Sequence, residues 1–452
     1  MRKNHQKQVS LTPTRIAHEH AKELEAIDDL LRAEPTLSEL VAQDLADGLD
    51  PDNGRPGMTG EQTLRAAIVR QMHGYSYDVL AFHLADSLSF QHFCGIGIGD
   101  SAPSKSALQR SIKRLTPQTW EKINRRLVVT AQSGGVESGR KSRVDCTVVG
   151  SPIHYPTDSS LLFDVVRVVA RLMSKAKSHC SSVVFSDRTR RAKRRSFDVG
   201  YAKKTKTRRI AYRDLVDVTI ETLEFVANAM PLLERFSEDL VADGASEVRG
   251  LIKELAHYSQ LGWRVVDQTH RRVFDDDKVA AGDKVVSIFE EHTDVIVKDR
   301  RETLFGHTVC LSTGASSLVL DCVVLDGNPA DSTLVEEMLD RHADLLGKPP
   351  RQAAFDGGFA SKANLELAKA KGVKDVCFHK KRGLAITDMV KSTWVFKKLR
   401  CFRAGVEGCI SFLKRSFGMG RCRWRGLQSF KSYVWASVVT CNLLILARHA
   451  MQ

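Results

Sequence analysis

The sequence predicts an α/β protein with long helical additions, and three observations lead to this class. Strand-like runs rich in β-branched residues alternate with helical patterns over residues 143–452. Residues 1–131 show only helical periodicity. A helical and basic stretch at about 155–280 interrupts the strand pattern soon after it begins. We therefore expect a mixed sheet with flanking helices, a helical insertion and an N-terminal all-helical domain.

The composition indicates a nucleic-acid partner. Lys and Arg number 68 against 54 Asp and Glu, a net charge of +14 on 452 residues, which favours a polyanion; a basic but unrelated enzyme is the alternative. The 10 cysteines include no C-x-x-C pair, so we expect reduced, buried thiols in a cytoplasmic protein. The N-terminus lacks the apolar run of a signal peptide, and the apolar run at 434–447 is too short to span a bilayer, so no membrane is expected.

The N-terminal part divides into a polar segment and a helical domain. Residues 1–57 are polar, with one helical pattern and a final loop rich in Pro and Gly. Residues 58–131 contain several short helices, the first of them capped by Thr59. The basic helix that ends near Leu115 is typical of a helix-turn-helix-like DNA reader, although many helical bundles expose Lys and Arg without binding DNA. The predicted DNA contacts on this helix are Lys105, Arg110, Lys113 and Arg114.

A Ser- and Gly-rich linker at 132–142 precedes a strand that contains Asp145. The insertion that follows includes a run at 188–209 with eleven Lys or Arg residues and one acidic residue. We interpret this run as a flexible segment that contacts the DNA backbone, and a solvated, disordered loop is the alternative. The predicted phosphate contacts in it are Arg190, Arg191, Lys193, Arg194, Arg195, Lys203, Lys204 and Lys206.

The strand pattern returns after the insertion. Strands are expected at 285–289, 307–311 and 318–325, followed by a helix that Asp331 caps. A further strand runs into Asp356 and two glycines, which allow a ligand or backbone to come close. The remaining expected elements are a helix at 362–371, a strand at 373–378, a helix that carries Glu407 and a buried helix at 427–449.

Three carboxylates can converge at one edge of this sheet. Asp145 and Asp356 belong to strands, and Glu407 shares a helix face with Arg403 and Lys414. Taken alone, Glu407 could belong to a solvated salt-bridged face, and each Asp could be structural. Together the carboxylates suit hard divalent ions such as Mg²⁺, and two such ions can activate a water or a 3′-hydroxyl. Arg403 and Lys414 are then placed to hold phosphates.

The residues resemble those of bacterial insertion-sequence transposases of the DDE type, whose catalytic domain has a ribonuclease-H-like fold. One subgroup carries the signature Y-x-x-R-x-x-x-E-x-x-x-x-x-x-K, which the chain matches at Arg403, Glu407 and Lys414 and departs from at Arg400, the Tyr position. The stretches around Asp145 and Asp356 resemble the strands of the two catalytic Asp residues. The resemblance covers residues 60–452 and is weakest over the insertion.

This resemblance implies a ribonuclease-H-like catalytic domain at 143–452 and a DDE triad of Asp145, Asp356 and Glu407 that binds two Mg²⁺ ions, for which Mn²⁺ can substitute. It also implies binding to the terminal inverted repeats of a mobile element, strand cleavage, and transfer of the freed 3′-hydroxyl to target DNA. The implied assembly is a homodimer or larger on paired double-stranded ends in the bacterial cytoplasm. The competing interpretations are a host nuclease of the same fold and a domesticated DNA-binding protein without catalysis.

Overall fold

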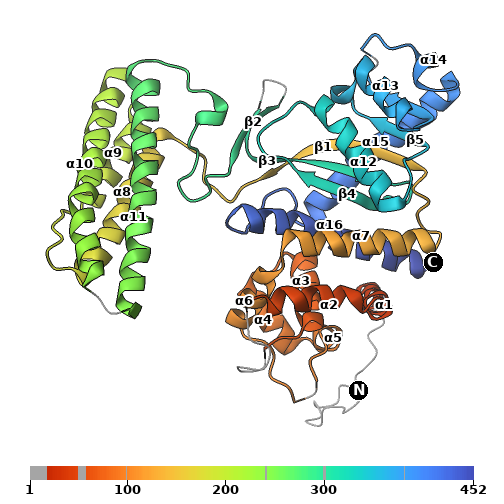
Figure 1. Ribbon diagram of the computed structural model, residues 1–452, viewed down its shortest axis with the longest axis horizontal. Coiled ribbons are helices and arrows are strands. Elements are labelled where there is room, and N and C mark those ends of the chain that lie inside the picture. Colours follow the sequence, from red (N-terminus) through yellow and green to blue (C-terminus); the bar gives the residue numbers. More distant parts are fainter. Residues whose placement is uncertain (1–17, 49–56, 98, 240–241, 299–301, 381) are drawn as a thin grey trace, which may run out of the picture. The chain divides into compact units, whose positions relative to one another are not determined.

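The computed structural model describes residues 18–48, 57–97, 99–239, 242–298, 302–380 and 382–452 (Figure 1). The predicted loop at 51–57 lies outside them except for Gly57. The chain forms two compact units, one made of residues 1–150 and 307–452 and the other of residues 151–306. The finer division into four parts stays a prediction.

The first unit contains a mixed sheet, which confirms the predicted ribonuclease-H-like α/β class. Its strands are β1 (Lys141–Gly150), the second half of β3 (Glu302–Thr313), β4 (Val319–Val324), β5 (Gln352–Phe355) and β6 (Asp375–Phe378). β1 pairs with β3 and with β5, β5 pairs with β6, and β4 pairs with β3. The β1–β5 and β5–β6 pairs are parallel, whereas β3–β4 is antiparallel.

Helices cover both faces of this sheet (Figure 1). Side chains alternate along a strand, so Cys310 packs with α12 while its neighbours Val309 and Leu311 join the core of α16. The helices after β4 are α12 (Val335–Leu346), α13 (Lys362–Ala370), α14 (Ile386–Met389), α15 (Thr393–Ser416) and α16 (Leu427–Ala450). Asp331 does not cap α12 as predicted, because it begins a 3₁₀ turn that leads into the helix.

The N-terminal helices share one hydrophobic core with α16. They are α1 (Glu19–Ala33), α2 (Thr36–Ala46), α3 (Gly60–His73), α4 (Tyr77–Asp86), α5 (Leu88–Phe93), α6 (Lys105–Arg114) and α7 (Pro117–Ser133). Thr59 caps α3 as predicted, through a hydrogen bond to the Gln62 amide. α16 is long and apolar enough to cross a membrane, but most of its apolar stretch is buried, which confirms the predicted core helix.

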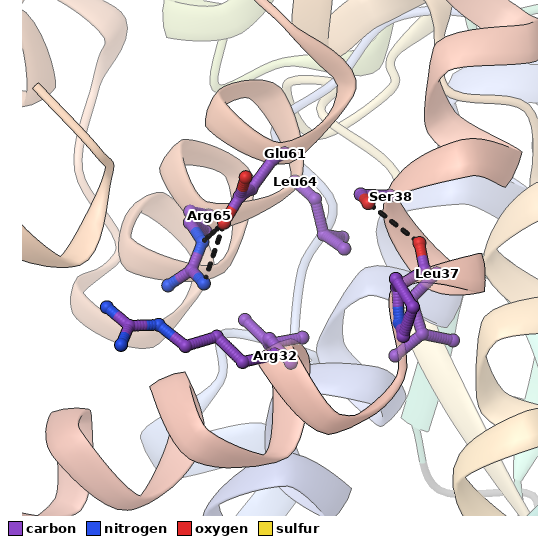
Figure 2. Close-up of a pocket in the computed structure, with 8 residues that line it drawn as sticks. Arg32, Leu37, Ser38, Glu61, Leu64 and Arg65 are labelled. Carbon is purple, nitrogen blue, oxygen red and sulfur yellow. Dashed lines mark hydrogen bonds and ion pairs between the residues drawn. The ribbon is translucent and has the colours of Figure 1, made fainter.

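A buried arginine joins three of these helices. Arg65 on α3 pairs with Asp28 on α1 and donates to the Phe93 carbonyl at the end of α5 (2.9 Å). Figure 2 shows Arg65 with its neighbour Glu61 on one side of a pocket between α1, α2 and α3, and Leu37 with Ser38 across from them. Because the guanidinium is almost fully buried, its partners are required to offset the cost of removing its charge from water.

The second unit consists mainly of a bundle of four helices (Figure 1). They are α8 (Asp158–His179), α9 (Thr189–Tyr201), α10 (Thr205–Glu238) and α11 (Ala242–Thr269). The basic run at 188–209 was predicted to be flexible, and this is wrong: it forms α9 and the first turn of α10. Ala192 and Val199 bury one side of α9 in the bundle core, which orders the helix despite its charge.

A strand predicted at 285–289 is also wrong. No strand forms there: residues 288 and 289 lie in a bend, and the side-chain amide of Gln268 pairs with the backbone of Val285. Its Oε1 accepts from the Val285 amide (2.8 Å) and its Nε2 donates to the Val285 carbonyl (3.2 Å). This unit does contain β2 (Asp294–Lys298), which pairs with the first half of β3, residues 302–306.

Two asparagines satisfy the free edge of β4. Asn442 on α16 accepts from the Val319 amide (2.9 Å) and donates to the Val319 carbonyl (2.8 Å). Asn124 on α7 donates to the Leu320 carbonyl (3.0 Å) and accepts from Asn442 (2.7 Å). All four groups are buried, so the side chains replace a neighbouring strand and close an edge that would otherwise be open to pairing.

We expect Asn442→Leu to lower the free energy of unfolding by about 2–4 kcal/mol, because it leaves the Val319 amide and carbonyl buried without partners. Urea denaturation followed by fluorescence measures the change. Asn228→Leu is the matched control at an exposed position of α10, with an expected change below about 0.5 kcal/mol. Equal changes in the two variants would contradict the role of Asn442.

Candidate active site

Asp145 and Asp356 lie side by side at one edge of the sheet. The parallel register of β1 and β5 pairs Val144 with Phe355, so the next residue on each strand is the predicted catalytic Asp. The Asp145 carboxylate accepts from the Cys146 amide (2.9 Å), which fixes its orientation. Parallel strands therefore bring together two carboxylates that are separated by more than two hundred residues in the sequence.

The turn after Asp356 has space only for glycine. A Cβ atom on Gly357 would lie 2.8 Å from the Lys380 Cβ, and one on Gly358 would lie 2.4 Å from an Asp331 carboxylate oxygen. Both distances are shorter than any contact that a real Cβ makes. The two glycines noted in the sequence thus let the turn fold tightly behind Asp356.

Glu407 comes to the same place from α15. One buried guanidinium, that of Arg403, contacts all three carboxylates. Its Nη1 donates to Glu407 Oε1 (2.8 Å), and its Nη2 donates to Asp145 Oδ2 (2.8 Å) and lies 3.2 Å from Asp356 Oδ1. The predicted triad therefore converges in space. Arg403 was predicted to hold phosphate, and in the structure its charge is directed to the carboxylates instead.

The exposure of these groups differs in a way that suits a reaction at the surface. Arg403 is 8% exposed, whereas the Glu407 side chain is 67% exposed and that of Asp356 is 37% exposed. Arg403 contacts Asp356 and Glu407 from the protein interior. The carboxylate oxygens of these two residues therefore stay open to solvent and to a large substrate such as DNA.

Arg143 is a residue that the sequence reasoning missed. It lies two positions before Asp145 on the same face of β1, and its buried guanidinium reaches α15. There it donates to the Phe402 carbonyl (2.8 Å) and stacks on the Phe402 ring, with 4.7 Å from Cζ to the ring centroid. It also donates to Thr313 Oγ1 on β3 (2.8 Å). Gly405 is required for this approach, since a Cβ there would lie 2.0 Å from Arg143 Nη1.

Arg143 thereby fixes the distance between the strand that carries Asp145 and the helix that carries Glu407. The available signal was a cation two positions before Asp145 in the same predicted strand, because strand alternation places positions 143 and 145 on one face. Its partners Phe402 and Thr313 are far from it in the sequence, so only the folded chain shows them.

The chemistry of the three carboxylates fits a hard divalent cation. They offer only oxygen ligands, and those of Asp356 and Glu407 are accessible. Among the described residues, no group of three His, Cys, Asp or Glu side chains is already arranged around a common metal position. A divalent ion and the Arg403 guanidinium are attracted to the same oxygens, so the ion must compete with Arg403 for them.

The predicted DNA contacts separate into exposed cations and structural ones. Arg114 donates to the Leu45 carbonyl on the C-terminal side of α2 (2.5 Å), and Arg191 and Arg195 pair with Asp214 on α10. Lys105 lies 3.3 Å from Asp78 and Lys414 is half-buried on α15. The remaining cations are exposed and are Arg110, Lys113, Arg190, Lys193, Arg194, Lys203, Lys204 and Lys206.

Two family models match the chain. The model described as the transposase DDE domain matches residues 260–443, which include β2 to β6 and the helix of Glu407. The model described as a transposase domain of otherwise unassigned function matches residues 14–114, which include α1 to α6. No curated protein and no solved structure matches the chain. The first match contains Asp356 and Glu407 but not Asp145, and it begins inside the predicted insertion. The second match contains the basic helix α6 and extends into the predicted polar N-terminal segment.

We expect divalent metal to raise the melting temperature of the Arg403→Gln variant more than that of the unaltered chain. Without the guanidinium the carboxylates repel one another, so the melting temperature in EDTA should fall. Mg²⁺ at about ten times its Kd should then restore about 1.4 kcal/mol. Differential scanning fluorimetry with MgCl₂ and MnCl₂ measures the shift, which should exceed that of the unaltered chain. The control is Arg403→Gln combined with Glu407→Gln, and an equal metal shift in this double variant would contradict binding at the triad.

Proposed function

Because this chain belongs to the DDE-type transposases of insertion sequences, we propose that it binds the terminal inverted repeats of a mobile element and cuts and joins DNA strands at Asp145, Asp356 and Glu407. The observation that carries the proposal is the convergence of these three carboxylates, from β1, the end of β5 and α15, on the single guanidinium of Arg403.

Each carboxylate has a distinct place in the proposed reaction. Asp145 is the most rigid, since the Cys146 amide and Arg403 hold both of its oxygens. Asp356 and Glu407 present accessible oxygens beside it. Two bound Mg²⁺ ions would activate a water or a 3′-hydroxyl and stabilise the leaving oxygen. When bound metal ions neutralise the three carboxylates, the Arg403 guanidinium can turn to a phosphate. Lys414, further along the same helix face, can do the same.

DNA is the proposed partner at two further surfaces, the basic helix α6 and the exposed cations of the insertion. The exposed Arg110 and Lys113 lie on one side of α6, which suits a helix that contacts a duplex groove. The only tight three-residue turn among the described N-terminal helices joins α3 to α4, and a longer segment precedes α6, so the resemblance to a helix-turn-helix is loose. The proposed assembly is a dimer or larger on paired element ends, acting in the bacterial cytoplasm.

We expect Glu407→Gln to fold, to bind element ends about as well as the unaltered chain, and to lose strand cleavage and transfer. The amide keeps the size of the side chain but removes the charge that attracts a divalent ion. Asp145→Asn and Asp356→Asn should behave alike, and pairs of these changes should add little. A strand-transfer assay with Mg²⁺, run beside a melting curve, measures the outcome.

The alternative for Glu407 is a purely structural ion pair with Arg403, which predicts lost stability with activity retained per folded molecule. Near-normal strand transfer per folded molecule of Glu407→Gln would therefore contradict the assignment of Glu407 to a catalytic triad. Cleavage without any joining of strands in the unaltered chain would instead indicate a nuclease of the same fold.

A separate prediction concerns the exposed charges of the insertion. Replacing four of them by Ala should weaken binding to all duplexes alike and flatten the salt dependence by about 0.9 per lost phosphate contact. The four are Lys193, Arg194, Lys203 and Lys204. Fluorescence anisotropy at several salt concentrations measures both quantities. The comparison variant Arg110→Ala/Lys113→Ala should instead reduce the preference for element ends over other duplexes. A loss of this preference in the fourfold variant would contradict the assignment of sequence preference to α6 and of backbone contacts to the insertion.

A further inference from the structure

Two aromatic rings lie on the solvent side of α9. Phe197 is 54% exposed and Tyr201 is 81% exposed. They are four residues apart, so they share one helix face, and their rings are nearly parallel with centroids 6.4 Å apart and an interplanar angle of 23°. The opposite face of α9, with Ala192 and Val199, is buried in the bundle. The rings therefore point outward because of the way the helix is packed, and the bundle core does not use them.

The aromatic pair continues a stripe of positive charge. Arg190 and Arg194 precede Phe197 at helical spacing on the same face, and Lys193 flanks them. Lys203 and Lys204 follow Tyr201 in the turn that leads to α10. All five cations are exposed. A pair of flat apolar rings is thus set between two clusters of Lys and Arg.

α9 is held in a fixed orientation by ion pairs on its inner side. Arg191 and Arg195 both pair with Asp214 of α10. Burial tends to raise the pKa of the Asp214 carboxyl, but the hydrogen bonds from Arg195 and Arg191 outweigh it, so the pKa is lowered and the carboxylate stays charged at neutral pH. The two paired arginines position the helix and leave the stripe of Arg190, Arg194, Phe197 and Tyr201 on its outer side.

We infer that Phe197 and Tyr201 form a stacking platform for the unpaired bases of single-stranded DNA, whose phosphates the flanking Lys and Arg side chains hold. Exposed base faces are present only in unpaired nucleotides, because duplex bases already stack on one another, whereas every unpaired base offers a π-face. A protein partner fits less well, since the core of a protein interface is depleted in charged residues and this pair is surrounded by cations.

The inference deepens the proposed function, because it rests on DNA as the partner and assigns a place to nucleotides that become unpaired when an end is opened or cut. It does not depend on the triad. Binding measured in EDTA tests the platform alone, whereas strand transfer in Mg²⁺ tests the triad, so each can fail without the other.

The test uses the full chain and fluorescein-labelled oligo-dT of about 15 nucleotides, with a duplex of equal length, both followed by anisotropy in EDTA. Phe197→Ala and Tyr201→Ala should each weaken oligo-dT binding about 5- to 100-fold and change duplex binding less than about twofold. Tyr201→Phe keeps the ring and should retain binding. The matched control is Tyr155→Ala, which removes a ring that is 73% exposed elsewhere in the same unit.

Phe197→Leu is a second variant that keeps an apolar side chain and a good helix former but removes the ring, so it should also lose oligo-dT binding with an unchanged melting temperature. Unchanged oligo-dT affinity in the alanine variants, or an equal loss on duplex and oligo-dT, would overturn the inference. A change in sedimentation with oligo-dT affinity unchanged would also overturn it and assign the pair to a protein interface.

Discussion

The geometry of the site depends on one interaction, the contact of the Arg403 guanidinium with three carboxylates. Three negative charges that come from a strand, a strand end and a helix repel one another, so a cation among them is required for the elements to approach. Arg403 is buried and supplies that charge from within the chain. The same position would make Arg403 a competitor of any divalent ion that bound these carboxylates.

A second arginine, Arg143, holds together the strand and the helix between which that contact forms. It joins β1 to α15 through the Phe402 carbonyl and ring, and Gly405 leaves the space that its guanidinium occupies. Asp145 and Glu407 therefore stand on elements whose separation is fixed independently of their own charges. We therefore expect conservative substitutions of these two carboxylates to leave the fold intact.

The N-terminal helices and the sheet are joined through α16. Its apolar side chains complete the core of α1 to α7, and Asn442 on the same helix closes the edge of β4. The helix α6, with its exposed Arg110 and Lys113, is thus built on the same core as the sheet that carries the carboxylates. The insertion has its own core, in which α9 is ordered by a buried apolar side and by ion pairs to Asp214.

The sequence by itself determined the α/β class, most of the strands and helices, and the identity of the three carboxylates, because these follow from local periodicity and from residue types with few uses inside a sheet. It could not determine that α9 is helical, since its order comes from packing on α8 and α10, nor that Gln268 replaces a strand beside Val285. The tertiary structure alone decided the role of Arg403 and Arg143. A guanidinium binds whichever acceptors the fold brings within reach, and for these two the acceptors lie on elements far apart in the chain.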